Sequence, residues 1–216
     1  FVNLPEGENK EKLIEDYVKG FSKNRRQTLG KKLRRLQALG NVEFSVTRGY
    51  SAELMQKYFA LEEQSWKARA GTAVTSDEKA ARLHDDFARA VAERNALFIY
   101  ELKLDGKTIA MYISIMYDRQ TVGWKMSFDE EYARFSPGNL LLLEVLKGCI
   151  ENDSPELDML SPATDNKKFW ATGEREHVAF YIFRRGIIGS MLWKWKFSVI
   201  SRLRNFKRKT PLKAAS

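Results

Sequence analysis

The chain has 216 residues, of which 44% are hydrophobic and 12% aromatic, enough for a real core and too many for a disordered protein. Its one cysteine, Cys149, excludes an intramolecular disulfide, and with only His84 and His177 beside it a Cys/His zinc site is excluded and no metal is expected. No stretch approaches the ~20 apolar residues that span a bilayer. The start at Phe1 shows neither a signal-peptide pattern nor an initiator methionine, so we expect the C-terminal part of a longer chain.

The net charge of +9 is unevenly distributed. Two segments, 17–42 and 177–216, hold many Lys and Arg side chains and no acidic one, whereas the rest of the chain holds all 28 Asp and Glu. Such asymmetry is typical of proteins that bind nucleic acid, anionic lipid or a phosphate-bearing ligand, although a solvated basic surface explains it equally well.

The first half of the chain predicts helices around one strand. Leu29, Leu33, Leu36 and Leu39 recur at helical spacing, and Gly40 supplies a stop. The elements expected here are helices over 10–19, about 22–39 and 51–67, a strand over 41–47, a loop over 68–74, and a helix to about 94 that opens on the capping box Thr75/Glu78.

The centre of the chain changes to a strand pattern. Three runs rich in β-branched and aromatic residues, 97–104, 108–117 and 121–128, predict an antiparallel meander, with Asp105-Gly106 as its first hairpin turn. The remaining expected elements are a helix over 139–151, a strand near 157–160, a short helix near 166–171, a strand over 177–184 and a basic helix over about 187–206. This order predicts a mixed α/β (α+β) fold with a mostly antiparallel sheet.

The junction Ser136-Pro137-Gly138 joins the meander directly to the long helix. The first amides of a helix lack intrahelical acceptors, and with the helix dipole they form an anion site that a glycine lets a phosphate approach. Arg134 adds a cation beside it. The alternative is that Ser136 is a simple N-cap, with Pro137 at the first helical position and nothing bound.

Four segments in this order resemble a known family: the basic helix from Ser22 to Gly40, Leu61–Lys67 followed by Gly71, Ser136–Leu141, and Leu157–Leu160 followed by Lys167 and Trp170. Together they resemble the acetyl-CoA-dependent N-acetyltransferase (GNAT) superfamily over residues 20–185. More narrowly, they resemble the branch of cellulose-biosynthesis-associated acetyltransferase-like proteins, which is related to the Fem-type transferases.

The resemblance implies an acyl-CoA site at the Ser136 turn, with the acyl-CoA as co-substrate. Strand residues Met126 and Phe128 would admit the pantetheine arm and polarise the thioester carbonyl with a backbone amide. The residues implied around the pyrophosphate are Arg134, Phe135, Ser136, Gly138, Asn139 and Leu140. Those implied for the acceptor pocket are Trp66, Lys167 and Trp170.

An acceptor amine must lose a proton before it attacks, so a carboxylate base is expected. Glu130 and Asp129 lie at the right end of the third meander strand, and Asp158 lies on the late strand that the resemblance marks as a site. A solvated turn explains the acidic residues at 129–131 equally well, and a turn or capping role explains Asp158. Cys149 is expected to pack in the core, because no histidine lies near it in sequence.

The C-terminal segment interleaves aromatic and basic residues, with Trp193 and Trp195 beside Lys194 and Lys196. Such a helix can lie on an anionic membrane surface, or it can pack on the domain as a basic tail. Nucleic acid is not an expected partner, since no helix-turn-helix or RNA-binding motif is present. We therefore divide the chain into a basic helical segment (1–40), an acyltransferase core (41–185) and an amphipathic tail (186–216).

The expected function is transfer of an acetyl or other acyl group from acyl-CoA to an amine or a hydroxyl, with a polysaccharide or cell-envelope precursor as the expected acceptor. The expected location is the cytoplasm, with peripheral membrane contact through the tail. Two alternatives stay open: a Fem-type transferase that takes its acyl group from aminoacyl-tRNA, and a non-catalytic module that associates with membranes.

Overall fold

The computed structural model describes residues 1–160, 164–176, 178 and 180–199. The chain divides into two compact units, residues 1–174 and 175–216. The first unit contains the sheet together with the N-terminal helices, because Leu29 and Leu36 of those helices are buried in its core.

The first unit is built on a six-stranded sheet in the order β1-β6-β5-β4-β3-β2. Its strands are β1 (Val2–Asn3), β2 (Val42–Arg48), β3 (Leu97–Leu104), β4 (Lys107–Tyr117), β5 (Gln120–Phe128) and β6 (Glu156–Asp158). All neighbouring strands are antiparallel except β5 and β6, which run parallel. The mixed α/β class with a mostly antiparallel sheet and a three-stranded meander at its centre is confirmed.

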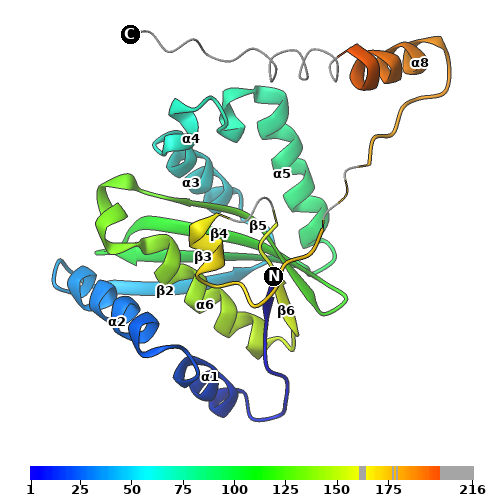
Figure 1. Ribbon diagram of the computed structural model, residues 1–216. Helices are drawn as coiled ribbons and strands as arrows, with labels where there is room; N and C mark the ends of the chain where they lie inside the picture. The colour runs from blue at the N-terminus through cyan, green and yellow to red at the C-terminus, as the bar shows by residue number, and fades with distance from the viewer. Residues whose placement is uncertain (161–163, 177, 179, 200–216) are drawn as a thin grey trace, which may run out of the picture. The chain divides into compact units, whose positions relative to one another are not determined.

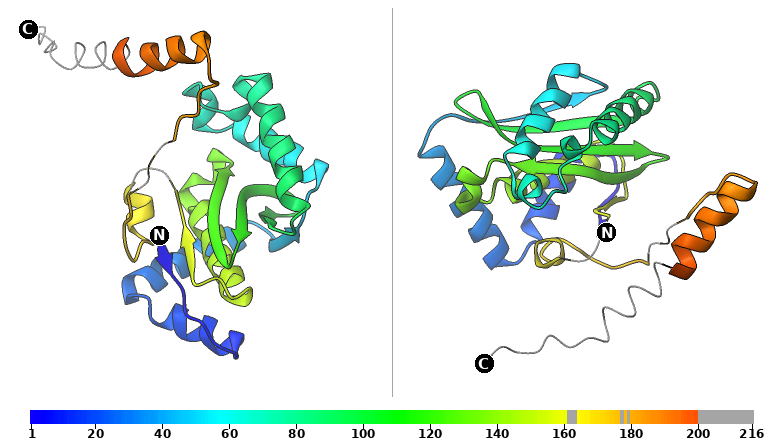
Figure 2. Two further views of the ribbon diagram at one scale, coloured as in Figure 1. Left: turned by 90° about the vertical axis from the view of Figure 1, so that its right-hand side faces the viewer. Right: turned by 90° about the horizontal axis from the view of Figure 1, so that it is seen from above.

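Helices cover both faces of the sheet (Figures 1 and 2). One layer contains α1 (Lys10–Lys19), α2 (Lys23–Gln37) and α6 (Pro137–Glu151), and the other contains α3 (Ala52–Glu63), α4 (Trp66–Arg69) and α5 (Glu78–Ala92). Each layer closes its own apolar core: Leu141 and Leu146 of α6 are fully buried against one face, and Met55 and Tyr58 of α3 against the other. The alternation of β4 side chains between the two cores explains why this strand is buried along most of its length.

The tight turns of the meander require a left-handed backbone. Asp105 and Gly106 have φ of 49° and 78°, as the expected hairpin turn demands, and the Asp105 carboxylate also accepts the Asn41 amide at 2.7 Å. Asp118 and Arg119 form the second turn with φ of 49° and 63°. That turn contains no glycine, so the left-handed backbone there depends on the tolerance of aspartate for this region.

Several predicted boundaries are wrong. Residues 178 and 180–184 form no strand, and the rest of the strand expected over 177–184 lies outside the described residues. Asp77, not Thr75, caps α5: its carboxylate accepts the Lys79 amide at 2.9 Å, which satisfies a first-turn donor from a position nearer the helix.

Helix ends and short elements account for the other differences. The sequence analysis missed β1 and the 3₁₀ helices η1 (Val74–Ser76) and η2 (Glu130–Phe135), and it did not separate α4 from α3. The later helices are α7 (Asp165–Lys168) and α8 (Ile187–Lys194), the latter followed by a π-helical turn, η3 (Trp195–Val199). Residues 200–206 of the expected basic helix lie outside the described residues.

The core of the α6 layer should dominate stability. Leu141 is fully buried, so Leu141→Ala should lower the free energy of unfolding by about 2–5 kcal/mol through lost apolar contact and a cavity. Leu83→Ala is the matched control, because Leu83 lies on helix α5 but is 66% exposed, and it should change stability by less than about 0.5 kcal/mol. Urea unfolding measures both, and equal losses would contradict this assignment of the core.

Candidate functional site

Strands β5 and β6 separate after a short parallel ladder. Their register runs from Gln120↔Glu156 to Val122↔Asp158, where β6 ends, while β5 continues to Phe128. Among the residues that the structure describes, no strand pairs with this edge of β5 beyond Val122. Backbone groups on such an edge are available to a ligand.

A β-bulge sits where this opening begins. The register of β4 and β5 shifts between Ile113 and Ser114, which leaves Trp124 of β5 without an opposite residue. The Trp124 ring stacks on His84 of α5, with centroids 5.5 Å apart and an interplanar angle of 7°, and Phe87 meets it edge-on at 5.0 Å. The bulge bends the strand at this point, and the ring contacts fix it.

The alternation of the antiparallel ladder tells which β5 groups face the opening. The Asp129 amide donates to the carbonyl of Ile109, its opposite residue, at 2.8 Å, so the backbone of Asp129 faces β4. Two residues back, Ser127 faces β4 as well. The backbone groups of Met126 and Phe128 therefore face away from β4, into the opening. These are the two strand positions predicted from the sequence.

Helix α6 begins beside this open edge. The 3₁₀ helix η2 lies between β5 and α6, which corrects the expectation of a single tight turn. Ser136 has a left-handed backbone (φ 54°, ψ 52°), and its side chain makes no capping hydrogen bond. The amides of Asn139 and Leu140 both donate to the Ser136 carbonyl, at 3.0 and 3.1 Å. Among the described residues, the Gly138 amide has no backbone acceptor, so it is the first-turn donor left for an anion.

Gly138 lets the start of α6 approach the open part of β5 closely. A Cβ atom at this position would lie 3.2 Å from Cε and 3.3 Å from Sδ of Met126, and 3.6 Å from the Phe128 ring. The helix N-terminus and the open strand edge are therefore neighbours. This juxtaposition brings together the positions predicted for a cofactor from two separate segments.

Arg134 and Phe135 precede that N-terminus. The Arg134 guanidinium lies over the Phe135 ring at 4.7 Å. The backbone carbonyl of Arg134 accepts a hydrogen bond from the Lys32 ammonium of α2. Phe135 is buried in the core. The basic helix α2 thus contacts the segment that leads into the N-terminus of α6.

The two carboxylates predicted as bases after β5 both have other partners. Asp129 is buried, where its side chain accepts the Glu131 amide at 3.1 Å and pairs with Lys107 at 2.7 Å, so it caps η2. Glu130 pairs with Arg69 of α4 at 2.5 Å. Glu130 is the more accessible of the two, with its side chain 30% exposed against 8% for Asp129.

Asp158 and Lys167 organise the end of β6. The Asp158 carboxylate accepts the Leu160 amide at 2.8 Å. The Lys167 ammonium donates to the carbonyls of Met159, at 2.8 Å, and Leu160. Burial lowers the pKa of Lys167, and the charge of Asp158 opposes that shift. Both side chains therefore tie down the backbone that follows β6.

Trp170 is a core residue. It is 1% exposed, its indole nitrogen donates to Asn139 Oδ1 at 3.0 Å, and the Arg25 guanidinium lies over its ring at 5.6 Å. The structure gives it the packing role, in which it fixes the first turn of α6 from the side of α7. The side chain of Trp66 lies outside what the structure describes.

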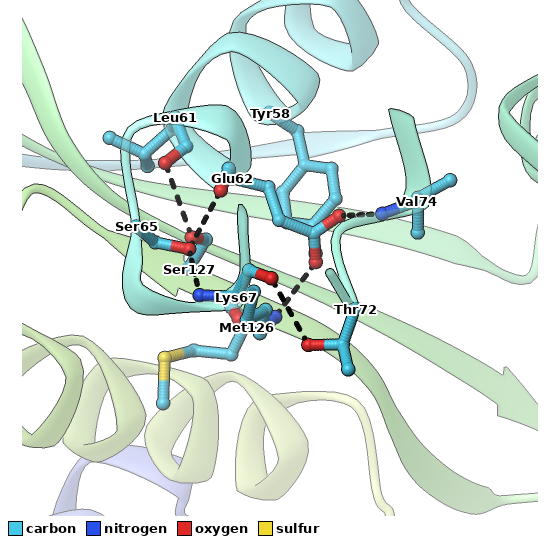
Figure 3. Close-up of polar contacts among 9 residues, drawn as sticks. All are labelled: Tyr58, Leu61, Glu62, Ser65, Lys67, Thr72, Val74, Met126 and Ser127. Atoms are coloured by element: carbon cyan, nitrogen blue, oxygen red, sulfur yellow. Dashed lines mark hydrogen bonds and ion pairs between the residues drawn. The ribbon is translucent and has the colours of Figure 1, made fainter. Parts of the chain in front are cut away.

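The sequence analysis missed the functional candidate Glu62. This carboxylate is 1% exposed at the end of α3, where Oε1 accepts from Tyr58 at 2.7 Å and from Lys67 at 2.8 Å, and Oε2 accepts from the Val74 amide at 2.8 Å (Figure 3). The Lys67 ammonium also donates to the carbonyl of Met126 at 2.7 Å. Two sequence signals were available: Glu62 lies one helical turn after Tyr58, and Glu62 and Lys67 both belong to the segment Leu61–Lys67 that carries the family resemblance.

The hydrogen bonds decide the ionisation of Glu62. Burial alone raises the pKa of a carboxyl group, but the bonds from Lys67, Val74 and Tyr58 outweigh it and hold the pKa of Glu62 below its ordinary value. Burial near this carboxylate also raises the pKa of Tyr58. Glu62 is therefore a carboxylate at neutral pH, with Tyr58 a neutral donor.

Other chemistry is limited in the part of the chain that the structure describes. Cys149 is buried, which raises the pKa of its thiol to about 12 and makes it a poor nucleophile. No group of three or more His, Cys, Asp or Glu side chains among these residues is placed to hold a metal ion. None of the described helices combines the length and apolarity needed to cross a membrane.

The chain belongs to a family of acetyltransferases: the family model described as "Acetyltransferase (GNAT) domain" matches residues 23–168, more than half of the sequence. Acyl transfer is thus the class of chemistry to which this domain belongs. None of the curated proteins matches the chain.

One solved structure shares the fold at low sequence identity. An aminoglycoside acetyltransferase from an uncultured soil metagenomic sample, in complex with sisomicin, is 12% identical, with a TM-score of 0.50 over 69% of this chain and 99% of its own. The C-terminal domain of a putative lysylphosphatidylglycerol synthetase from Agrobacterium fabrum is 16% identical, with a TM-score of 0.45 over 66% of this chain and 43% of its own.

The depressed pKa of Glu62 predicts a pH-dependent stability. A carboxyl whose pKa is lower in the folded state stabilises the fold above its unfolded pKa of about 4.3, and this contribution is lost as the pH falls through the folded value. The stability difference between wild type and Glu62→Gln should therefore be largest near pH 7 and shrink below about pH 4.3. Urea unfolding across this range measures it.

The matched control is Glu53→Gln on the same helix. Glu53 pairs with Lys57 at 2.7 Å but is 75% exposed, so solvent screening leaves that pair little value. A pH-independent difference for Glu62→Gln, or an equal effect at Glu53, would contradict the assignment.

Proposed function

We propose that this protein transfers an acetyl group from acetyl-CoA to an amine. One observation carries the proposal: the open edge of β5 at Met126 and Phe128 lies against the N-terminus of α6, with Gly138 as the point of closest approach. Unpaired backbone groups on a strand edge bind amides, so the edge of β5 suits an extended amide-containing arm. A helix N-terminus binds anions, so the first turn of α6 suits a pyrophosphate.

The residues present fit acetyl-CoA as co-substrate. The backbone of Met126 and Phe128 would hold the pantetheine arm along the strand edge, and the Gly138 amide with Arg134 would face the pyrophosphate. A strand amide on this edge would polarise the thioester carbonyl and stabilise the charge that develops on its oxygen.

Direct attack by the acceptor then requires no covalent enzyme intermediate. The amine nitrogen forms a bond to the carbonyl carbon, the C–S bond breaks, and the CoA thiolate leaves. An alkyl ammonium with a pKa of ~10.4 must first lose a proton, which costs on the order of 4–5 kcal/mol at pH 7. Among the carboxylates near the end of β5, the accessible Glu130 is the better base, once its pair with Arg69 opens.

The resemblance seen in the sequence makes amines of polysaccharide or cell-envelope precursors the first acceptors to screen. The Fem-like alternative, with aminoacyl-tRNA as the donor, is separated by a tRNA-binding measurement across salt, because phosphate contacts give a steep salt dependence.

Gly138→Val tests the acetyl-CoA site. A branched side chain at this position collides with Met126 and Phe128, so it should separate the helix N-terminus from the strand edge and weaken acetyl-CoA binding by more than about tenfold, or 1.4 kcal/mol. Isothermal titration calorimetry measures the dissociation constant.

Gly30→Ala is the control for glycine replacement in a helix, since its Cβ would meet only the flexible Arg34 side chain, at 3.3 Å. It should bind acetyl-CoA as the wild type does. Absence of acetyl-CoA binding to the wild type, or unchanged binding by Gly138→Val, would refute the proposed site.

We propose peripheral membrane contact as a second role, for the tail. Helix α8 and the turn after it expose large apolar side chains, including Ile187 at 82%, Trp193 and Trp195, in a segment with basic and no acidic residues. Aromatic side chains at this density next to cations favour the interface of an anionic bilayer.

Vesicle flotation tests this role. The wild type should float with vesicles that contain phosphatidylserine and less with pure phosphatidylcholine, and Trp193→Ser with Trp195→Ser should reduce flotation several-fold, as lost apolar burial costs about 0.8 kcal/mol per methylene equivalent. Flotation that the double variant leaves unchanged would rule out the tail as the anchor.

A further inference from the structure

The contact between Lys67 and Met126 joins the Glu62 cluster to the open strand edge. Lys67 lies on α4, distant in sequence from β5, and its ammonium bridges Glu62 Oε1 at 2.8 Å and the Met126 carbonyl at 2.7 Å (Figure 3). No step of the proposed reaction uses Glu62, Tyr58 or Lys67. A buried carboxylate is tolerated only when it is paired and hydrogen-bonded, and the three donors to Glu62 meet that requirement.

The Met126 carbonyl is one of the groups that face the opening between β5 and β6. In a continuous sheet, a neighbouring strand would fix the direction of such a carbonyl through a ladder hydrogen bond. Here the described part of the chain supplies no such neighbour beyond Val122, and a charge-assisted bond from Lys67 takes its place. The ammonium thus fixes one backbone group on an edge that has no ladder of its own.

Glu62 in turn fixes Lys67. Its carboxylate collects donors from three successive elements: the Tyr58 hydroxyl of α3, the Lys67 ammonium of α4 and the Val74 amide of η1. The Lys67 carbonyl also accepts the Thr72 amide at 2.8 Å, so the loop between α4 and η1 closes on the same residue. Both the backbone and the side chain of Lys67 are therefore held.

We propose that Lys67 is a positioning residue for the co-substrate: held by Glu62, it sets the direction of the Met126 carbonyl and so the shape of the strand edge along which the pantetheine arm of CoA binds. This inference rests on the proposed function. It assigns to the Lys67–Glu62 pair an effect on the arm of CoA and none on its nucleotide end.

The test removes the pair together. Lys67→Met alone leaves the Glu62 carboxylate buried without its counter-ion and is expected to destabilise the fold. The double variant Lys67→Met/Glu62→Gln removes both charges and leaves a neutral amide that the Tyr58 hydroxyl still reaches. The matched control is Lys57→Met/Glu53→Gln, which removes an exposed Lys–Glu pair from α3, the helix that also carries Glu62.

Two ligands distinguish a role of Lys67 in positioning the pantetheine arm from a general structural defect. CoA carries the pantetheine arm, whereas adenosine 3′,5′-bisphosphate keeps the phosphorylated nucleoside and lacks the arm. In calorimetry, the Lys67/Glu62 double variant should bind CoA about tenfold or more weakly, because the charge-assisted hydrogen bond that orients the Met126 carbonyl is lost. Its affinity for adenosine 3′,5′-bisphosphate, and both affinities of the control variant, should stay within about twofold of the wild type.

Each other outcome overturns the inference. Unchanged CoA binding by the double variant shows that Lys67 does not shape the arm's site, and equal weakening of both ligands shows a merely structural role. A wild type that binds neither ligand refutes the proposed function, and the inference with it. A wild type that binds both, with no ligand-selective loss in the double variant, refutes the inference alone.

Discussion

The rest of the site depends on the parting of β5 from β6. A parallel pair that ends at Val122 leaves β5 with an edge whose hydrogen-bonding groups must find other partners. Three features of the site lie at or next to this unpaired edge. The bulge at Trp124 bends the strand at the opening, α6 places its first turn beside the free edge, and a lysine from α4 occupies one of the free carbonyls.

Side chains from both helix layers converge on this one strand. Met126 and Phe128 point toward the α6 layer, where Gly138 meets them, while Ser127 donates to the Leu61 carbonyl of α3 at 3.5 Å on the opposite side. A single strand therefore faces the first turn of α6 on one side and α3, α4 and η1 on the other. This explains how one turn and one network, far apart in sequence, act on the same few backbone groups.

The local pattern of the sequence predicted the sheet well, because alternation, helical spacing and Asp-Gly turns are local signals. Local pattern also predicted the turn at Gly138, whereas the strand positions Met126 and Phe128 were implied by the family resemblance. It could not predict the partners that ionisable groups find across the fold. Asp129 pairs with Lys107, Trp170 packs under Asn139, and Lys67 reaches Met126, all through contacts that only the folded chain brings together.

The brevity of the β5–β6 ladder has a mechanical consequence as well. Three register pairs, helped by the bond between Thr121 and Ser154 hydroxyls at 2.8 Å, join β6 and β1 to the four-stranded remainder of the sheet. Regions with few interstrand bonds open at lower free energy than the centre of a sheet. The junction between β5 and β6 is thus a weakly paired line across the sheet, and a ligand bound along it would bridge the two sides and stiffen them.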